Sequence, residues 1–388
     1  PGEQQAPNLE VRPADGIDDA QAECRPASVD ANQVFRSSFA GTDGTKADAT
    51  EAEIAGVLGI SESNAGTRVH RAVAKLREAK GATIRNVRIR RGQNGILLNR
   101  VNDSKLYDND CSFLTGWGVG MFRSSGNTLT RNALDFCVRG HSEGVYNRGQ
   151  DSAGLLMFEQ CSNNVIVENS ITHGGDGIFG FCGLEALNAE GAPAGYDHTR
   201  KGCNDNLFMG NDLSYAPAHG LEMTFSFGNK VINNRFVENA ICGVWGGYSQ
   251  EFLIAGNEFS GNGGMAYGME RGGINIEHAA GNVIVGNRFA NNKVGVYLWW
   301  RGNGDFAEKT WGKANYKGLV NNVIAGNTFV IDPGHPFKNL PANQKLIGVQ
   351  LKQEAPDKFK NTVYAGNAAE RTGRSPWAKP GCSAARST

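Results

Sequence analysis

A short unit repeats along most of this chain, from about residue 81 onward. Each unit holds an apolar run that ends in Asn, and another apolar residue follows two positions later. These Asn residues are Asn109, Asn132, Asn169, Asn211, Asn234, Asn257, Asn287, Asn327 and Asn367. Four of the spacings, counting the one from Asn86 to Asn109, are 23 residues, and the others are 37, 42, 30, 40 and 40. Insertions into one unit explain the longer spacings, so the pattern predicts a stacked repeat protein.

A second strip follows each Asn, in which Gly precedes alternating apolar residues. Examples are DGIFG from residue 176, HGLEM from 219 and GGINI from 272. A period of two predicts β-strands, and the intervals hold no helical stretch long enough for βαβ units. We therefore expect an all-β solenoid in which each turn of the chain stacks on the last. Its inward stack should include Leu134, Ile171, Leu213, Phe236, Phe259, Phe289 and Phe329.

These Asn-containing repeats resemble the right-handed, single-stranded parallel β-helix of the pectin-lyase-like superfamily over residues 81–370. The resemblance implies that the Asn column lies at a tight bend, where Asn tolerates left-handed backbone and its amide bonds to the Asn of the next rung. Many such proteins act on carbohydrates, which favours an extracellular or periplasmic location, although the chain as given shows no signal peptide. Lyases, hydrolases, epimerases and binders share this fold, so the fold does not choose among them.

The segment before the repeat has a different pattern. Residues 1–47 are typical of a flexible leader, and residues 371–388 form a C-terminal tail. Residues 48–80 predict a short helical segment, in which Ser61 caps a helix that carries Arg68, His70, Arg71, Lys75 and Arg77. This stretch resembles part of the helix-turn-helix of sigma-factor region 4. The helices that should precede it are missing, so we favour a cap on the solenoid or a fusion remnant and do not expect DNA binding.

The composition of the chain excludes some classes of binding partner and ligand. The chain has 39 Lys+Arg and 39 Asp+Glu, and this balance argues against a general polyanion binder. No apolar run is long enough to span a membrane. The eight cysteines lack CxxC spacing, so we predict no metal site and no required cofactor; Ca²⁺ is compatible, but no motif indicates it. Cys182 and Cys203 are the pair to test as a disulfide, and we expect a monomer.

Side chains at equal offsets from the Gly should align along the solenoid, about 4.8 Å from rung to rung. The even offsets should face outward, and they carry aromatic and polar residues that suit a sugar. The predicted substrate-binding residues are Trp245, Tyr248, Arg271, Asn275, Tyr297, Trp299 and Trp300. Outward aromatics can also form a satellite core under loops, and we favour that role for Phe122, Phe158 and Phe181.

The candidate catalytic residues are Asp176, His219, Glu222, Glu277 and His278. Asp176 and His219 both precede the Gly on adjacent rungs and can pair if the Gly marks a bend, because strict alternation would turn them inward. Glu222 and Glu277 should face outward with Cα atoms roughly 12 Å apart, which would suit an inverting hydrolase. A lyase or epimerase would instead use His219, His278, Tyr248 and Arg271.

We therefore hypothesise an enzyme that cleaves a polysaccharide, either a glycoside hydrolase or a polysaccharide lyase. One alternative is a non-catalytic glycan-binding or structural β-helix. A second alternative is a sigma-factor-like fusion whose output is DNA binding.

Overall fold

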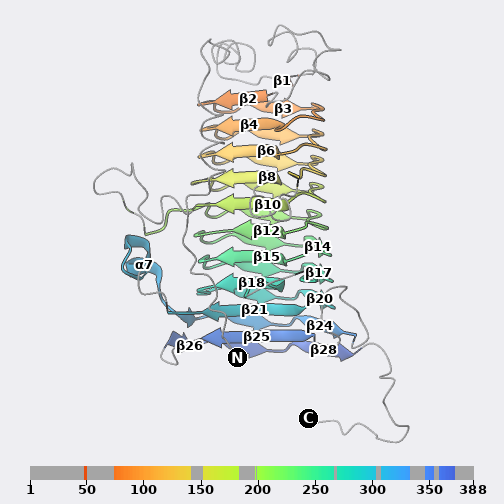
Figure 1. Ribbon diagram of the computed structural model, residues 1–388. Coiled ribbons are helices and arrows are strands. Elements are labelled where there is room, and N and C mark those ends of the chain that lie inside the picture. Colours follow the sequence, from red (N-terminus) through yellow and green to blue (C-terminus); the bar gives the residue numbers. More distant parts are fainter. Residues whose placement is uncertain are drawn as a thin grey trace, which may run out of the picture.

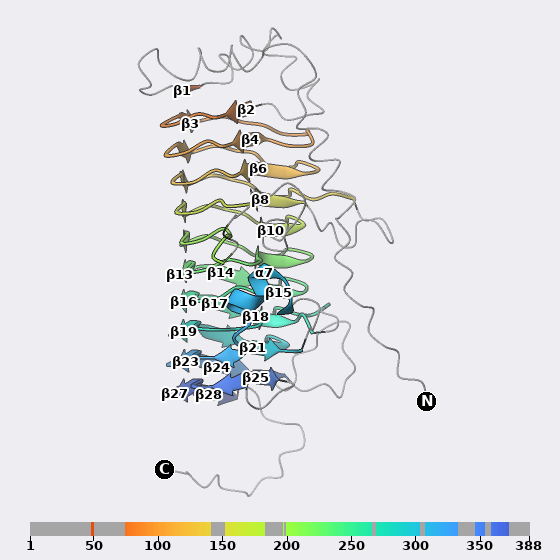
Figure 2. The same ribbon diagram turned by 90° about the vertical axis from the view of Figure 1, so that its left-hand side faces the viewer.

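The computed structural model describes residues 48–49, 74–140, 152–182, 197, 199–265, 269–302, 307–332, 346–353 and 358–371. The chain winds into a column of stacked coils, and each coil adds one strand to each of two long sheets (Figures 1 and 2). Every strand pair in these sheets is parallel, as in the pairing of β10 (Asp176–Phe181) with β12 (His219–Met223). The predicted single-stranded parallel β-helix is confirmed.

Three sheets form the faces of the column. The first runs through β1 (Asp48–Ala49), β3 (Thr83–Arg85), β5 (Lys105–Tyr107), β7 (Thr128–Thr130), β9 (Val165–Val167), β11 (Leu207–Met209), β13 (Lys230–Ile232), β16 (Leu253–Ala255), β19 (Val283–Val285), β23 (Val323–Ala325) and β27 (Val363–Ala365). The second, which holds the Gly strips, runs through β2 (Ala74–Arg77), β4 (Ile96–Asn99), β6 (Trp117–Phe122), β8 (Ala153–Phe158), β10, β12, β15 (Cys242–Gly247), β18 (Gly272–Glu277), β21 (Val294–Trp300) and β25 (Ile347–Gln353).

The third sheet is shorter. It comprises β14 (Arg235–Val237), β17 (Glu258–Ser260), β20 (Arg288–Ala290), β24 (Thr328–Ile331) and β28 (Ala368–Arg371). A further pair joins β22 (Leu319–Val320) to β26 (Phe359–Lys360), and a short helix, α7, spans Thr310–Asn315. No helix among the described residues is long and apolar enough to cross a membrane.

The core is a stack of identical positions along the column. The rings of Phe236, Phe259, Phe289 and Phe329 stack in sequence with centroids 4.8–4.9 Å apart, and all four are buried. Leu134, Ile171 and Leu213 occupy the same position on earlier rungs and are buried too. Each rung therefore buries the apolar face of its neighbour, as the sequence pattern predicted.

The Asn ladder is present, with one correction. The amide nitrogen of Asn211 donates to Oδ1 of Asn234 at 2.9 Å, and the same contact recurs from Asn109 to Asn367. The left-handed backbone, however, belongs to the residue before each Asn, such as Glu168 (φ 57°) and Gly210 (φ 66°). Asn86 has this left-handed φ itself, while Val87 takes the ladder position and donates to Asn109, so Asn86 was wrongly counted in the series.

The Gly strip marks a close approach between backbones. A Cβ added at Gly177 would lie 2.4 Å from the carbonyl oxygen of Gly220, and Gly243 and Gly273 face the next Gly carbonyl in the same way. The residue before each Gly lies on the outer side, together with the residue two positions after it: Cys242 packs with Trp245, and Val294 with Tyr297. The Gly therefore interrupts the alternation, as the predicted Asp176–His219 pair requires.

Two expectations about packing are settled. The predicted satellite core is present, because Phe122, Phe158 and Phe181 pack together on the outer side of the second sheet with Leu97 and Leu156. The sulfur atoms of Cys182 and Cys203 lie 3.1 Å apart, and both cysteines are free thiols.

The predicted helix before residue 80 is wrong where the structure describes it. Lys75 and Arg77 lie on strand β2, which pairs with β4 in the second sheet, and β1 is also a strand. The solenoid therefore begins before residue 81. Ser61, Arg68, His70 and Arg71 lie outside the described residues, as do the leader 1–47 and the C-terminal tail after Arg371. The helix-turn-helix resemblance gains no support.

Candidate functional site

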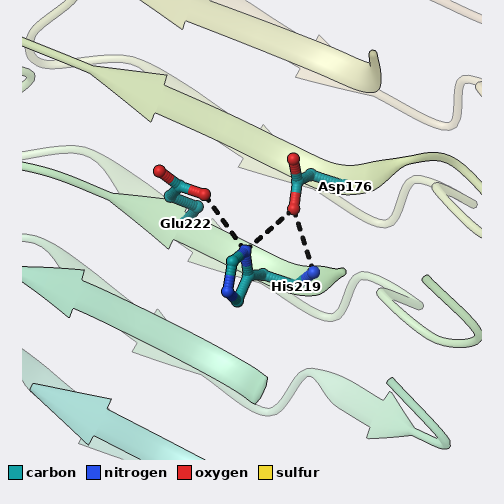
Figure 3. A group of neighbouring side chains, drawn as sticks. All are labelled: Asp176, His219 and Glu222. Atoms are coloured by element: carbon teal, nitrogen blue, oxygen red, sulfur yellow. Dashed lines mark hydrogen bonds and ion pairs between the residues drawn. The ribbon is translucent and has the colours of Figure 1, made fainter. Parts of the chain in front are cut away.

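Four polar side chains converge on the outer side of the second sheet. Asp176 begins strand β10 and His219 begins β12, and the register that pairs Ile178 with Leu221 sets the two side by side (Figure 3). Glu222 lies on β12, three residues after His219, and Glu270 comes from the segment before β18. We call Asp176, His219, Glu222 and Glu270 the His219 cluster.

The imidazole of His219 is at the centre of this cluster. Nδ1 lies 3.0 Å from Oδ1 of Asp176 and 3.0 Å from Oε2 of Glu222 (Figure 3). The backbone N–H of His219 also donates to Asp176 Oδ1, at 2.9 Å. On the other side of the ring, Nε2 lies 3.8 Å from Oε2 of Glu270. The side chains of Asp176 and His219 are each only 2% exposed, whereas those of Glu222 and Glu270 are 13% and 27% exposed.

The environment changes the pKa values of two members. Burial lowers the pKa of His219, but the neighbouring carboxylates of Asp176, Glu222 and Glu270 outweigh it and hold the pKa well above its usual range. Burial raises the pKa of Glu222 to about 7, against the lowering effect of His219.

Partly exposed groups adjoin the cluster. The indole of Trp245 stacks on the ring of His219 with centroids 5.6 Å apart, and its Nε1 has no hydrogen-bond partner among the described residues. Arg271 follows Glu270, and its guanidinium lies 5.2 Å from the ring centroid of Tyr297. Trp245 and Arg271 are both half-buried. Their predicted role in substrate binding stays a prediction.

Glu277 and His278 form a separate group. Oε1 of Glu277 lies 3.3 Å from Nε of Arg301 and 3.9 Å from Nδ1 of His278. The ring of His278 stacks on Tyr248 at 4.6 Å, and Trp311 of α7 packs edge-on against Tyr248. Burial raises the pKa of Glu277 to about 7, lowers that of His278 to about 3 and raises that of Tyr248 well above its usual range.

The structure therefore separates two carboxylates that were predicted to act together. The register pairs Glu222 with Trp245, Trp245 with Asn275, and Gly247 with Glu277, which is the predicted offset of two rungs and two residues. Glu222 contacts His219 at the start of its strand, whereas Glu277 contacts Arg301 beyond the end of β21. Each carboxylate thus belongs to its own group.

Five predicted substrate-binding residues are buried, among them Tyr248 at 7% exposure. Tyr297, Trp299 and Trp300 are at most 4% exposed, and Asn275 is fully buried. Nε1 of Trp299 donates to Oδ1 of Asn275 at 2.8 Å. The prediction that these side chains present open surfaces is wrong, because other parts of the protein pack over the outer side of the sheet here.

Sequence reasoning missed Glu270 and Arg301. Both lie in insertions between rungs, at 263–272 and 301–318, where the repeat does not fix the path of the chain. The sequence did hold a signal for both residues. Glu270 is next to Arg271 and Arg301 is next to Trp300, in loops that were expected to flank the Gly-containing strands.

Three members of the His219 cluster could hold a metal ion. Asp176, His219 and Glu222 each offer one ligand atom, and these atoms lie within 4.8 Å of one another. Within the described ranges this is the one such group of His, Cys, Asp and Glu side chains.

Two protein-family models match the sequence. Residues 60–191 match a right-handed β-helix region, and residues 196–335 match NosD, described as a periplasmic copper-binding protein. Together with the parallel sheets, the first match makes the chain a right-handed parallel β-helix, as predicted. A search of the curated proteins gives no match.

Solved structures with a similar fold have low identity. The Dettilon tailspike protein is 11% identical, with a TM-score of 0.36, over 76% of this chain and 57% of the tailspike chain. The Streptococcus pneumoniae surface protein and adhesin PfbA is 11% identical, with a TM-score of 0.39, over 78% of this chain and 79% of its own. A mannuronic acid specific polysaccharide family 6 lyase from human gut microbiota is 12% identical, with a TM-score of 0.34, over 84% of this chain and 83% of the lyase chain. This chain thus spans little more than half of the tailspike.

Proposed function

We propose that this right-handed parallel β-helix protein cleaves the glycosidic bonds of a polysaccharide at the His219 cluster. One observation carries the proposal: three carboxylates converge on one buried imidazole, and two of them, Glu222 and Glu270, are partly exposed on the outer side of a rigid sheet. Groups that can donate and accept protons, held by strands and open on one side, are what such a reaction needs.

Both classes of cleavage can use this arrangement. Hydrolysis needs a carboxylic acid that protonates the leaving oxygen and a carboxylate on the other face of the sugar. Glu222 and Glu270 flank opposite nitrogens of the His219 ring, so they offer such a pair in place of Glu222 and Glu277. β-Elimination needs a base and a positive group that neutralises a uronate carboxylate, and Arg271 beside Glu270 is that positive group.

Trp245 supports a sugar as the ligand. Its half-buried indole lies against His219, and its buried Nε1–H has no hydrogen-bond partner among the described residues. An aromatic ring with a polar edge beside carboxylates can pack on the CH face of a sugar while its hydroxyls find acceptors.

The test is a screen of the full chain against neutral and uronate-containing polysaccharides, with reducing ends and the ultraviolet absorbance of unsaturated products followed together. Reducing ends without absorbance indicate hydrolysis, and both signals together indicate β-elimination. Glu270→Gln and Glu222→Gln should each lower turnover. Glu258→Gln, an exposed carboxylate on β17 of the third sheet, is the matched control and should not. Polysaccharide binding without either signal would overturn the proposal in favour of a non-catalytic binder.

A further inference from the structure

We propose that Asp176, His219 and Glu222 bind one first-row divalent metal ion of the Zn²⁺ class. The ligand atoms are Oδ1 of Asp176, Nδ1 of His219 and Oε2 of Glu222 (Figure 3). The inference stands on ligand geometry and does not rest on the proposed function.

The distances between the ligand atoms fit a single small ion. Nδ1 of His219 lies 3.0 Å from each of the two carboxylate oxygens, and the three atoms lie within 4.8 Å of one another. Two atoms that bind one ion at about 2.1 Å are themselves roughly 3.0–3.4 Å apart, for angles between a right angle and the tetrahedral angle of Zn²⁺. The separations are therefore those of neighbouring ligands around one ion.

The hydrogen bonding leaves a role for a cation. Nδ1 of an imidazole carries at most one hydrogen, yet two carboxylate oxygens face it here at equal distance. Among the described residues, the only ion-pair partner of Asp176, Glu222 and Glu270 is His219. Three carboxylates around one imidazole leave negative charge that is costly to bury. A divalent ion would balance this charge, with the lone pair of Nδ1 and both oxygens directed at it.

The far side of the His219 ring gives an independent indication. Nε2 of His219 is buried and makes no hydrogen bond among the described residues, while Oε2 of Glu270 lies 3.8 Å away. A histidine that binds a metal through one nitrogen usually directs its other N–H at a carboxylate, which fixes the ring and raises its basicity. Glu270 is in the place of such a partner, whereas a purely structural histidine has no need of it.

The three ligand atoms limit which metal ions are expected to bind. One imidazole nitrogen and two carboxylate oxygens suit Zn²⁺, Mn²⁺ or Cu²⁺. Ca²⁺ prefers six to eight oxygen ligands, and Cu⁺ prefers thiolate and thioether sulfur. Three protein ligands with a partly exposed member, Glu222, leave a coordination position open on the outer side.

The test measures metal binding without any polysaccharide. The full chain is stripped with a chelator, and Zn²⁺, Mn²⁺, Cu²⁺ and Ca²⁺ are titrated separately by calorimetry, with metal content read after dialysis. We expect one Zn²⁺ per chain and weaker binding of Ca²⁺. Glu222→Gln should abolish the site, and Glu270→Gln should weaken it on the order of 10–100-fold. His278→Gln, a buried histidine outside the cluster, is the control and should leave binding unchanged.

Thermal unfolding keeps the test decisive if a variant is less stable. Zn²⁺ should raise the Tm of the wild type and of His278→Gln but not that of Glu222→Gln. Absence of stoichiometric Zn²⁺, or equal binding by the wild type and Glu222→Gln, would overturn the inference. Cleavage by metal-free protein would leave the proposed function standing without a catalytic need for the ion. Bound Zn²⁺ without cleavage of any polysaccharide would support the metal site and would count against the proposed function.

Discussion

Asp176 Oδ1 accepts a hydrogen bond from the backbone N–H of His219 at 2.9 Å and lies 3.0 Å from Nδ1 of the same residue, although 43 residues separate the two in sequence. The parallel pairing of β10 with β12 makes this contact, and the glycines that follow both residues turn their side chains to the outer side. The position of the imidazole is thus set by the strand scaffold and not by a loop.

Replacing Asp176 by Asn should therefore loosen His219. The substitution keeps the size of the side chain but removes a buried charge that accepts the backbone N–H of His219 and faces its Nδ1, so we expect a loss of about 1–3 kcal/mol in the free energy of unfolding. Urea unfolding measures it. Asp103→Asn is the control, because Asp103 is exposed in a surface ion pair with Lys80 and should change stability little. Equal stability of Asp176→Asn and the wild type would contradict this role.

Gly177→Ala should disturb the same scaffold. A Cβ at this position would lie 2.4 Å from the backbone oxygen of Gly220, which cannot move without shifting strand β12. Gly286 has a left-handed φ of 63° but open space around it, so Gly286→Ala should cost only about 1 kcal/mol. Gly177→Ala should cost more than Gly286→Ala in urea unfolding and should also lower activity. A smaller loss of stability for Gly177→Ala than for Gly286→Ala would contradict this prediction, because it would show that the strands can move apart at Gly177 and Gly220 at little cost.

The Asn ladder should carry much of the stability of the column. The side chain of Asn211 accepts from both nitrogens of Asn169 and donates to Ile166 O and Asn234 Oδ1. Asn211→Ala leaves these buried groups without partners, so we expect a loss of about 2–4 kcal/mol. Asn99→Ala, at a half-buried position outside the ladder, should cost less. A loss for Asn211→Ala that matches Asn99→Ala would show that water replaces the ladder.

The repeat made the fold and half of the site predictable. Asp176 and His219 could be paired from sequence because each has a fixed offset from a Gly, and parallel strands align equal offsets, whereas Glu222 was paired with Glu277 and not with His219. Glu270 and Arg301 could not be placed, because insertions have no period. The side chains of Tyr297 and Trp299 lie on the outer side of the sheet, as predicted. They are nevertheless buried, because the offsets do not encode which other residues pack over them.

The second group, around Glu277, predicts a pH dependence of stability. The groups that face Glu277 are Arg301, His278, Tyr248 and Glu270. Burial raises the pKa of Glu277 from 4.5 to about 7, so between these values the folded state keeps a proton that the unfolded chain has lost. Stability from this group is therefore full below pH 4.5 and is lost as pH rises to 7, by at most about 1.4 kcal/mol per pH unit.

Glu277→Gln should remove that loss, so its stability relative to the wild type should increase from pH 4.5 to 7. His278 has the opposite sign: its pKa is lowered from 6.5 to about 3, so stability from this group is lost as pH falls through that range. His278→Gln should therefore gain on the wild type as pH decreases from 6.5. Urea unfolding at several pH values measures both, and a pH-independent difference for Glu277→Gln would contradict the shift.

The central claim is that the His219 cluster cleaves a polysaccharide, and the most direct measurement is the initial rate of new reducing ends for the wild type, Glu270→Gln and Glu258→Gln on one substrate. Glu270 contacts His219 and is the most exposed carboxylate of the cluster, so its variant should lose at least about 100-fold in rate, as expected for a lost proton-transfer group. Glu258→Gln should match the wild type. Equal rates for the wild type and Glu270→Gln would contradict the claim.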